Sequence, residues 1–595
     1  MNNGFSCRVQ FSGNVLVVLA AIAGLFWGFY DPLTPLLAQS FVAPSLESQR
    51  VDLPSPGRIL LPPQPSQPII PPSPLPSPPL EIFPSNPIPP NLPQNVPGTI
   101  TVSRFEFQGN SAFSSEELAE VTAPFTQRPL TFAELLAAES AVTQFYTEAG
   151  YINSGVMIPA GQIFDQNQAV ITIQIVEGGL EDIQVQVEGQ LDPDYVKSRL
   201  AIATEKPFNQ KRLLEALQLL QLNPLIESIS AELSAGPRPE LSLLSVQVKE
   251  ANTFNIETFT DNGRVQSIGS WERGLRISEG NLLGIGDGIT LDYANSDGSN
   301  AVTASYTLPL NPHNGTLKAA IQYNNTVVIE EPFNILDITG DSLYFDLSYR
   351  QPLIQTPRQE LALGLTTSYS ASQTSLLGEG FPLSPGANND GQTRIAALRF
   401  FQEWTERGSE DVLALRSQFS LGLGILDANV NNLPPDGRFF EWRGQGQYVR
   451  LLGPETLFVF RSAVQLSTEP LVPLEQLTLG GLNTVRGYRQ DLLLTDNGIF
   501  ASTEVRLPVL RVEEIQGVLQ IVPFLDFGVG WNDRDNPIPT PNPNTLASVG
   551  LGLLWQMGDR LTARLDWGLP LTEFRVQGNT VSQQSLYFSV SYNLF

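Results

Sequence analysis

The chain has 595 residues and a formal net charge of −26, with 16% charged residues, one cysteine and one histidine. That length predicts more than one domain, and the acidic balance, with no outstanding lysine and arginine cluster, argues against a nucleic-acid partner. The only cysteine, Cys7, lies in a segment expected to be removed, so disulfides, thiolate catalysis and Cys/His zinc sites are excluded from the mature chain.

Other catalytic signals are sparse. His313 lies in an NPHNG stretch that is typical of a solvated turn, and the sequence contains neither a GxSxG motif nor a cluster with metal-ligand spacing. We therefore expect no catalytic residue, no metal and no cofactor.

The N-terminal region carries the only long apolar run, Val15–Tyr30, which follows Arg8 and precedes a cleavage-type end, LLA, before Gln39. This order is typical of a secretory signal peptide over residues 1–38. A retained membrane anchor is the alternative, because the run falls just short of the roughly 20 residues that span a bilayer. No later segment predicts a transmembrane helix, so any membrane span would be made of strands.

A proline-rich segment follows, with 18 prolines between Val51 and Ile100. Proline fixes φ and removes the backbone donor, so we expect residues 39–99 to form a semi-rigid polyproline linker, with room for only a short helix at 39–50. A ligand for a proline-reading module is the alternative interpretation.

Two related units come next, each in the order strand, helix, helix, strand, strand. The helices of the first unit open on capping boxes, Ser114 with Glu117 and Thr131 with Glu134, and the second unit has a helix start at Asp192 followed by proline. The repeated order predicts an internal duplication. The expected strands are Ile100–Phe107, Gly155–Ile158, Ala169–Val176, Ile183–Val187, Ile226–Leu233 and Leu241–Val248.

From Thr253 onward apolar and polar residues alternate in segments of membrane-crossing length, and Leu413–Ile425 is the clearest. Short connections alternate with long polar loops, which predicts an outer-membrane barrel with turns on one side and loops on the other. Reading strands between the connections gives 16, from Thr253–Thr260 to Gln584–Phe595. A soluble β-sandwich is the alternative.

The stretch LGGLNTVRGYRQD, Leu479–Asp491, lies in the long loop before the twelfth of these strands. An arginine there is hard to explain by packing, which predicts a loop folded into the lumen. On the thirteenth strand, alternation turns Phe524, Asp526 and Gly528 toward the lumen. A carboxylate at membrane depth is costly unless it is hydrated or paired. We therefore expect the planar fork of Arg486 to bind Asp526.

These residues resemble a known family. LGGLNTVRGYRQD is similar to the characteristic loop of the two-partner secretion transporters (haemolysin secretion/activation proteins of TpsB type), which share a superfamily with the BamA assembly factor. FLDFG, Phe524–Gly528, resembles the inner-wall motif of that family, and NLLGIGD, Asn281–Asp287, resembles the turn after its second strand. The paired units resemble its two POTRA (polypeptide-transport-associated) domains. The resemblance covers residues 100 to 595.

The resemblance implies a mainly β fold, with a C-terminal 16-stranded antiparallel transmembrane β-barrel preceded by two α+β POTRA domains. It also implies a lumen lock or gating motif, in which Gly487 permits a tight tip and Tyr488 packs on the lumen wall near Phe524. Whether the Arg486–Asp526 contact gates the pore or only braces it is open. The motif residues are Val485, Arg486, Gly487, Tyr488, Phe524, Asp526 and Gly528. The expected domains are a signal peptide (1–38), a linker (39–99), POTRA domain 1 (100–178), POTRA domain 2 (179–250) and a barrel (251–595) with loop 468–497 in its lumen.

In function, the resemblance implies a non-enzymatic transporter in the outer membrane that exports an unfolded partner exoprotein from the periplasm. The partner is expected to be a secreted, TpsA-like β-helical protein, captured by β-augmentation at a POTRA edge strand near Val156 or Ile229. Outer-membrane lipid and the barrel assembly machinery are the other expected partners. A BamA-like insertase and a passive porin are the alternatives.

Overall fold

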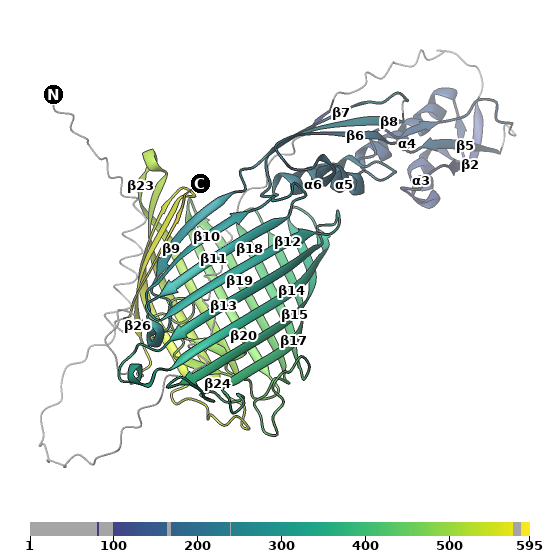
Figure 1. The fold of residues 1–595 in the computed structure, drawn as a ribbon. Helices are drawn as coiled ribbons and strands as arrows, with labels where there is room; N and C mark the ends of the chain where they lie inside the picture. The colour runs from purple at the N-terminus through teal and green to yellow at the C-terminus, as the bar shows by residue number, and fades with distance from the viewer. Residues whose placement is uncertain (1–79, 83–98, 164–167, 239, 575–584, 595) are drawn as a thin grey trace, which may run out of the picture.

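The computed structural model describes residues 80–82, 99–163, 168–238, 240–574 and 585–594. In this part of the chain two small α/β units stand at one end of a closed β-barrel (Figure 1). None of its helices is long and apolar enough to cross a membrane. The expected signal peptide and the expected helix at 39–50 lie outside the described residues.

The first unit is built on a four-stranded sheet in the order β3-β2-β5-β4. Both predicted capping boxes are present, because Ser114 and Thr131 accept bonds from the backbones of Glu117 and Glu134 and so satisfy free helical N–H groups. Helices and strands share one buried apolar cluster. The elements are β2 (Ile100–Gln108), α3 (Ser115–Thr122), η1 (Ala123–Phe125), β3 (Pro129–Leu130), α4 (Phe132–Glu148), β4 (Gly155–Met157) and β5 (Ala169–Val176).

The second unit repeats this arrangement, with its first strand parallel to its last and its second strand antiparallel to the last. Its sheet has the order β1-β7-β8-β6. The outer strand β1 (Leu80–Ile82) comes from the proline-rich segment, for which the sequence predicts only a linker. The other elements are β6 (Gly179–Glu188), α5 (Pro193–Ala203), α6 (Gln210–Gln221), β7 (Ile226–Ala235) and β8 (Leu241–Glu250).

The barrel closes where its last strand, β27, pairs with its first, β9. Because β15 pairs directly with β17, the two-residue strand β16 adds nothing to the wall, and the predicted number of 16 wall strands is confirmed within the described residues. The wall strands are β9 (Asn255–Asp261), β10 (Glu272–Glu279), β11 (Gly288–Ser296), β12 (Ser299–Pro309), β13 (Thr316–Val327), β14 (Thr339–Gln355), β15 (Gln359–Leu376), β17 (Gln392–Arg407), β18 (Asp411–Leu423), β19 (Phe440–Gly453), β20 (Thr456–Ser467), β23 (Asn497–Val512), β24 (Gly517–Trp531), β25 (Thr545–Met557), β26 (Leu561–Pro570) and β27 (Leu586–Asn593).

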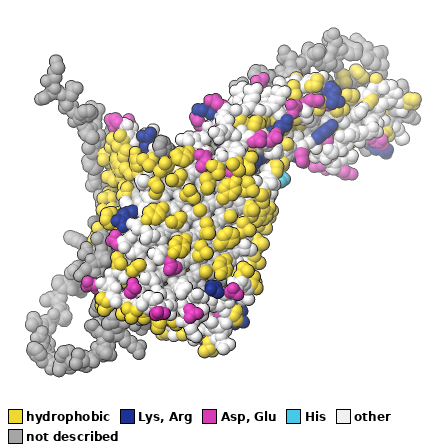
Figure 2. Space-filling model, viewed as in Figure 1, with side chains coloured by type: hydrophobic (Ala, Val, Ile, Leu, Met, Phe, Trp, Pro, Cys, Tyr) yellow, Lys and Arg dark blue, Asp and Glu magenta, His cyan; other side chains and the backbone are white. Residues whose placement is uncertain are grey.

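Alternation along each strand separates an apolar outer face from a polar lumen. On β24 the side chains of Leu525 and Phe527 are exposed, whereas Phe524, Asp526 and Gly528 are buried. Figure 2 shows the result on one side of the barrel, where hydrophobic side chains form a broad surface. Such a surface is stable against lipid and costly against water.

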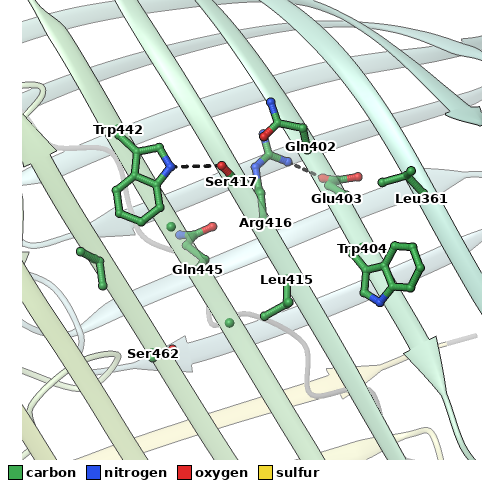
Figure 3. Close-up of a pocket in the computed structure, with 13 residues that line it drawn as sticks. Leu361, Gln402, Glu403, Trp404, Leu415, Arg416, Ser417, Trp442, Gln445 and Ser462 are labelled. Carbon is green, nitrogen blue, oxygen red and sulfur yellow. Dashed lines mark hydrogen bonds and ion pairs between the residues drawn. The ribbon is translucent and has the colours of Figure 1, made fainter.

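The wall also contains a shallow depression of about 340 Å³ across β17 to β20 (Figure 3). Gly444 and Gly446 leave room there between larger side chains, and Trp442 Nε1 donates to Ser417 Oγ at 3.1 Å. Beside it, Arg416 Nη1 donates to Glu403 Oε1 at 2.5 Å. No residue of the loop between β20 and β23 lines this depression.

The second unit is seated on two turns of the barrel. The Asp192 N–H donates to the carbonyl of Gly284 at 2.7 Å, in the NLLGIGD turn between β10 and β11. Arg199 Nε donates to Asn314 Oδ1 at 2.7 Å, in the turn between β12 and β13. The seat therefore joins this unit to two hairpins of the wall.

Candidate functional site: the loop in the barrel lumen

The loop between β20 and β23 is a narrow hairpin folded into the barrel. Its arms, β21 (Leu477–Leu479) and β22 (Leu493–Thr495), pair antiparallel, and residues 480–492 between them form what we call the tip. Apolar side chains of the loop pack against Phe500 and Leu546 of the wall. A buried apolar cluster that the loop shares with the wall thus holds the loop inside the barrel.

At the tip, Arg486 binds Asp526 of β24 as the sequence predicts. Arg486 Nε lies 2.7 Å from Asp526 Oδ2, and Nη2 lies 2.8 Å from Oδ1, so the guanidinium binds both carboxylate oxygens. The backbone N–H of Arg486 donates to Oδ2 as well, at 3.1 Å. The arginine is 1% exposed and the aspartate 0%, so neither charge is solvated and each depends on the other.

A ring of further charges surrounds this pair. Arg486 Nη1 lies 3.3 Å from Glu504 and 3.4 Å from Asp566, and Nη2 lies 3.3 Å from Ser502 Oγ. Arg564 pairs with both of these acidic residues, and Arg506 pairs with Glu504. Three arginines thus face three carboxylates. We call these six charged residues the lumen cluster: Arg486, Glu504, Arg506, Asp526, Arg564 and Asp566.

Each residue of the FLDFG motif that faces the lumen makes a separate contribution. The guanidinium carbon of Arg486 lies 3.5 Å from the ring centre of Phe524, a cation–π contact. Asp526 supplies the bidentate pair. A Cβ on Gly528 would lie 2.9 Å from Val485 Cγ2, so this glycine makes room for the buried valine. The alternate residues of one strand therefore seat two consecutive residues of the tip.

Gly487 lies against the backbone of β26. Its φ is +98°, which side chains rarely adopt, and a Cβ there would lie 3.2 Å from the carbonyl of Gly568. Its N–H donates to the hydroxyl of Tyr587 at 3.1 Å, and that hydroxyl donates to the carbonyl of Tyr488. Gly487, Gly568 and the buried Tyr587 thus allow the backbone of the tip to contact the backbone of β26.

Tyr488 reaches the wall at a different place from the one that the family resemblance implies. Its hydroxyl donates to the carbonyl of Ala547 at 2.7 Å and accepts from the N–H of Thr572 at 3.0 Å. Its ring meets Phe574 edge-on at 6.4 Å between centroids. Arg486 covers the face of the Phe524 ring. The Tyr488 hydroxyl instead binds the backbone of β25 and of the segment that follows β26.

The tip also contacts two loops that connect wall strands. Arg489 Nε donates to Gln266 Oε1 at 2.7 Å, between β9 and β10, and Arg489 Nη2 lies 2.6 Å from Glu330 Oε1, in the loop after β13. Together with the contacts on β24 and β26, these bonds attach the tip to several parts of the barrel. A cavity of about 800 Å³ beside the tip is lined by six arginines and five acidic residues, so the lining of the lumen there is highly polar and nearly charge-balanced.

The two predicted partner-binding positions lie on equivalent strands with different surroundings. Val156 lies on β4, which pairs only with β5 among the described strands. Ile229 lies on β7, where Leu80–Ile82 pair with Ala231–Leu233 on the outer side, and its own side chain is buried. The outer edge of β7 is therefore occupied over these three residues, and partner binding near Val156 or Ile229 stays a prediction.

Sequence reasoning missed most of the lumen cluster. Alternation alone turns Glu504 and Arg506 to the lumen on β23, and Arg564 and Asp566 on β26, so the signal was present. Only the register between β23 and β26 shows that these side chains meet the same arginine. Tyr587 and Gly568 were missed for the same reason.

Comparison with known families gives two matches. The family described as haemolysin secretion/activation protein ShlB/FhaC/HecB matches residues 240–554. The POTRA domain of ShlB type matches residues 100–178, which is the first α/β unit.

Similar proteins include the outer membrane transporter CdiB of Escherichia coli, 24% identical over 79% of each chain. The heme/hemopexin transporter protein HuxB of Haemophilus influenzae is 22% identical over 75% of this chain and 79% of that protein. The solved structure of CdiB from Escherichia coli has a TM-score of 0.67 at 20% identity and covers 88% of this chain and 94% of that one. CdiB from Acinetobacter baumannii has a TM-score of 0.60 at 17% identity, with 84% and 91% covered. The structures share the fold.

Proposed function

The chain belongs to the haemolysin secretion/activation protein family ShlB/FhaC/HecB, and on that premise we propose that it exports a partner exoprotein through its barrel. The barrel lies in the outer membrane and the POTRA units lie in the periplasm. Relatives named as transporters support export. Export through the barrel requires the loop that is folded into the lumen to move.

The lumen cluster is the observation that carries the proposal. Arg486 pairs with three carboxylates of the wall, so withdrawal of this one side chain from the lumen would break all three ion pairs of the tip. When the tip leaves, Arg506 and Arg564 still face Glu504 and Asp566, and water can enter to solvate Asp526. The charges of the lumen cluster that remain in the wall are therefore paired or solvated both before and after the loop withdraws.

Capture of the exoprotein takes place before the pore, at a POTRA sheet edge. An extended segment can add a strand to an open edge, where main-chain bonds give affinity and alternate side chains give specificity. Both units have a strand in the corresponding position, β4 in the first and β7 in the second. The exoprotein in this proposal is a secreted, TpsA-like β-helical protein, and outer-membrane lipid and the barrel assembly machinery are the partners of the barrel itself.

Two other functions fit less well. A passive porin has no use for two POTRA units or for a lumen filled by a charged loop. An insertase for other barrels would share the loop, but the similar proteins named above are transporters. Neither alternative is favoured by a specific contact of the described residues.

The test is Arg486→Ala, compared with Arg416→Ala. Removing one partner of a buried ion pair costs about 3–5 kcal/mol, so the loop-in state should lose a hundredfold or more in population. We expect a several-fold rise in mean conductance in planar bilayers and a loss of control over secretion. Arg416 pairs with Glu403 in the wall without touching the loop, so its removal should leave conductance unchanged.

The exoprotein for the secretion assay is the product of an adjacent gene, if that gene encodes a large secreted repeat protein. An Arg486→Ala protein with wild-type conductance, loop position and secretion would contradict the role of the cluster. The absence of any such neighbouring gene product would favour the insertase.

A further inference from the structure

The outer edge of β7 in the second POTRA unit is already occupied by the chain itself. Leu80, Glu81 and Ile82 run parallel to Ala231, Glu232 and Leu233. Figure 1 shows β7 at the outer side of this sheet, beyond β8 and β6. The corresponding strand of the first unit, β4, has no such neighbour among the described strands.

The occupying strand is short for a reason that is visible in the sequence. Pro78 and Pro79 precede it and Pro84 follows it, so backbone N–H donors run only from Leu80 to Phe83. Proline cannot donate to a strand ladder. The linker pairs with three residues of β7, which is ten residues long, and the flanking prolines limit the stretch that could pair to four residues.

The edge under this strand suits a longer partner. Along β7 the buried residues Ile229, Ala231 and Leu233 alternate with exposed Ser230 and Glu232. A partner strand paired with these residues shares their faces, so its alternate side chains lie on the buried face of the sheet. Opposite Glu232 a basic side chain gives a favourable cross-strand pair.

We infer that Leu80–Ile82 is a placeholder, which an extended, proline-free segment of the exoprotein displaces from β7. The inference rests on the proposed export function and chooses between the two candidate edges. The segment alternates apolar and polar residues and carries lysine or arginine opposite Glu232. The exoprotein segment can pair along all of β7, whereas the placeholder pairs along only three residues. The exoprotein segment therefore binds β7 more tightly and displaces the placeholder.

The placeholder is tested first without any exoprotein. The full-length variant Leu80→Pro, Glu81→Pro and Ile82→Pro removes every donor of β1, and its control, Gln67→Pro, Ile69→Pro and Ile70→Pro, adds the same number of prolines elsewhere in the linker. The probe is a labelled peptide of residues 76–87, PSPPLEIFPSNP. We expect it to bind the first variant at least tenfold more tightly than the wild type or the control. Equal binding to all three proteins overturns the inference.

A cross-link then tests the role in export. Neighbouring strands lie about 4.7–4.9 Å apart, within the range of about 4.4–6.8 Å that a disulfide spans between Cα atoms. Glu81→Cys with Glu232→Cys joins a registered pair, and Gly155→Cys with Val176→Cys joins one in the first unit without covering the outer edge of β4. We expect oxidation to reduce secretion tenfold or more in the first variant only, with recovery on reduction.

The outcomes separate the two proposals. If the disulfide between positions 81 and 232 forms and secretion is unaffected while Arg486→Ala still opens the pore, β7 is not the capture edge and the inference fails alone. If no link forms under oxidation, the placeholder is absent and the inference also fails. If the wild type exports no partner and Arg486→Ala changes nothing, the proposed function fails.

Discussion

At the scale of single residues, two glycines on different elements let the backbone of the tip lie directly against the backbone of the wall. A Cβ on Gly568 would lie 2.7 Å from the Gly487 nitrogen, closer than real Cβ atoms come to other heavy atoms. The Gly568→Ala protein should therefore push the tip off β26, although every charge of the lumen cluster is kept. We expect conductance to rise toward that of Arg486→Ala, measured in planar bilayers.

Gly453→Ala is the matched control, because a Cβ at this position of β19 meets no atom within 4 Å. It should conduct as the wild type does. Wild-type conductance in Gly568→Ala would mean that the tip tolerates displacement at β26 and that the ion pairs alone position it.

The sequence was sufficient to predict the Arg486–Asp526 pair, but not the residues that surround it. Alternation on one strand and a charged loop were enough to join Arg486 to Asp526. Tyr488 was expected near Phe524 and contacts Ala547 and Thr572 instead, because Arg486 covers the Phe524 ring. Such competition for one aromatic face depends on three-dimensional packing that no local pattern encodes.

At the scale of elements, Glu177 ties together three parts of the first POTRA unit. Its carboxylate accepts from the N–H groups of Ser111 and Ala112, each at 2.7 Å, and from the Tyr146 hydroxyl at 3.0 Å. Burial acts to raise the pKa of Glu177, but a hydrogen bond from the Ser111 hydroxyl, together with those from the two N–H groups and Tyr146, outweighs it and holds the pKa below the ordinary value.

Because the folded state lowers this pKa, the ionised form of Glu177 stabilises the unit. The contribution is complete above the unfolded value, about pH 4.3, and is lost as the pH falls toward the folded one. Protection from hydrogen exchange over residues 100–178 of the full-length protein, measured relative to the intrinsic exchange rate at each pH, should therefore fall below about pH 4.3.

Glu177→Gln should weaken protection at neutral pH and flatten this pH dependence, whereas Glu120→Gln, on exposed helix surface, should change neither. The same acid profile in Glu177→Gln and the wild type would assign the effect to other carboxylates.

Sequence predicted the regular elements well, for a physical reason. Helix caps and strand alternation are local, and the capping boxes at Ser114 and Thr131 appear where expected. β1 could not be predicted, since a three-residue strand between prolines has no pattern of its own and forms only because β7 offers an edge.

At the scale of the whole molecule, the barrel closes on itself without help from the POTRA units. Its first and last strands, β9 and β27, pair directly, so deletion of residues 100–250 removes no wall strand. We expect the truncated protein to form a heat-modifiable barrel in outer membranes, as seen in gel mobility before and after boiling, but to neither bind nor secrete the exoprotein. Retained exoprotein binding would contradict capture by the POTRA units.

The two-point seat of the second POTRA unit has a mechanical consequence. A domain attached to the barrel at one point can rotate about that point, whereas a domain attached at two points transmits its rotation to the barrel. Pulling on β7 therefore loads the β10–β11 turn through Gly284, and β10 is bonded to β9, which is bonded to β27. β27 carries Tyr587, whose hydroxyl holds the backbone of Gly487. Strain applied to the second POTRA unit in the periplasm can thus be passed along these paired strands to the tip in the lumen.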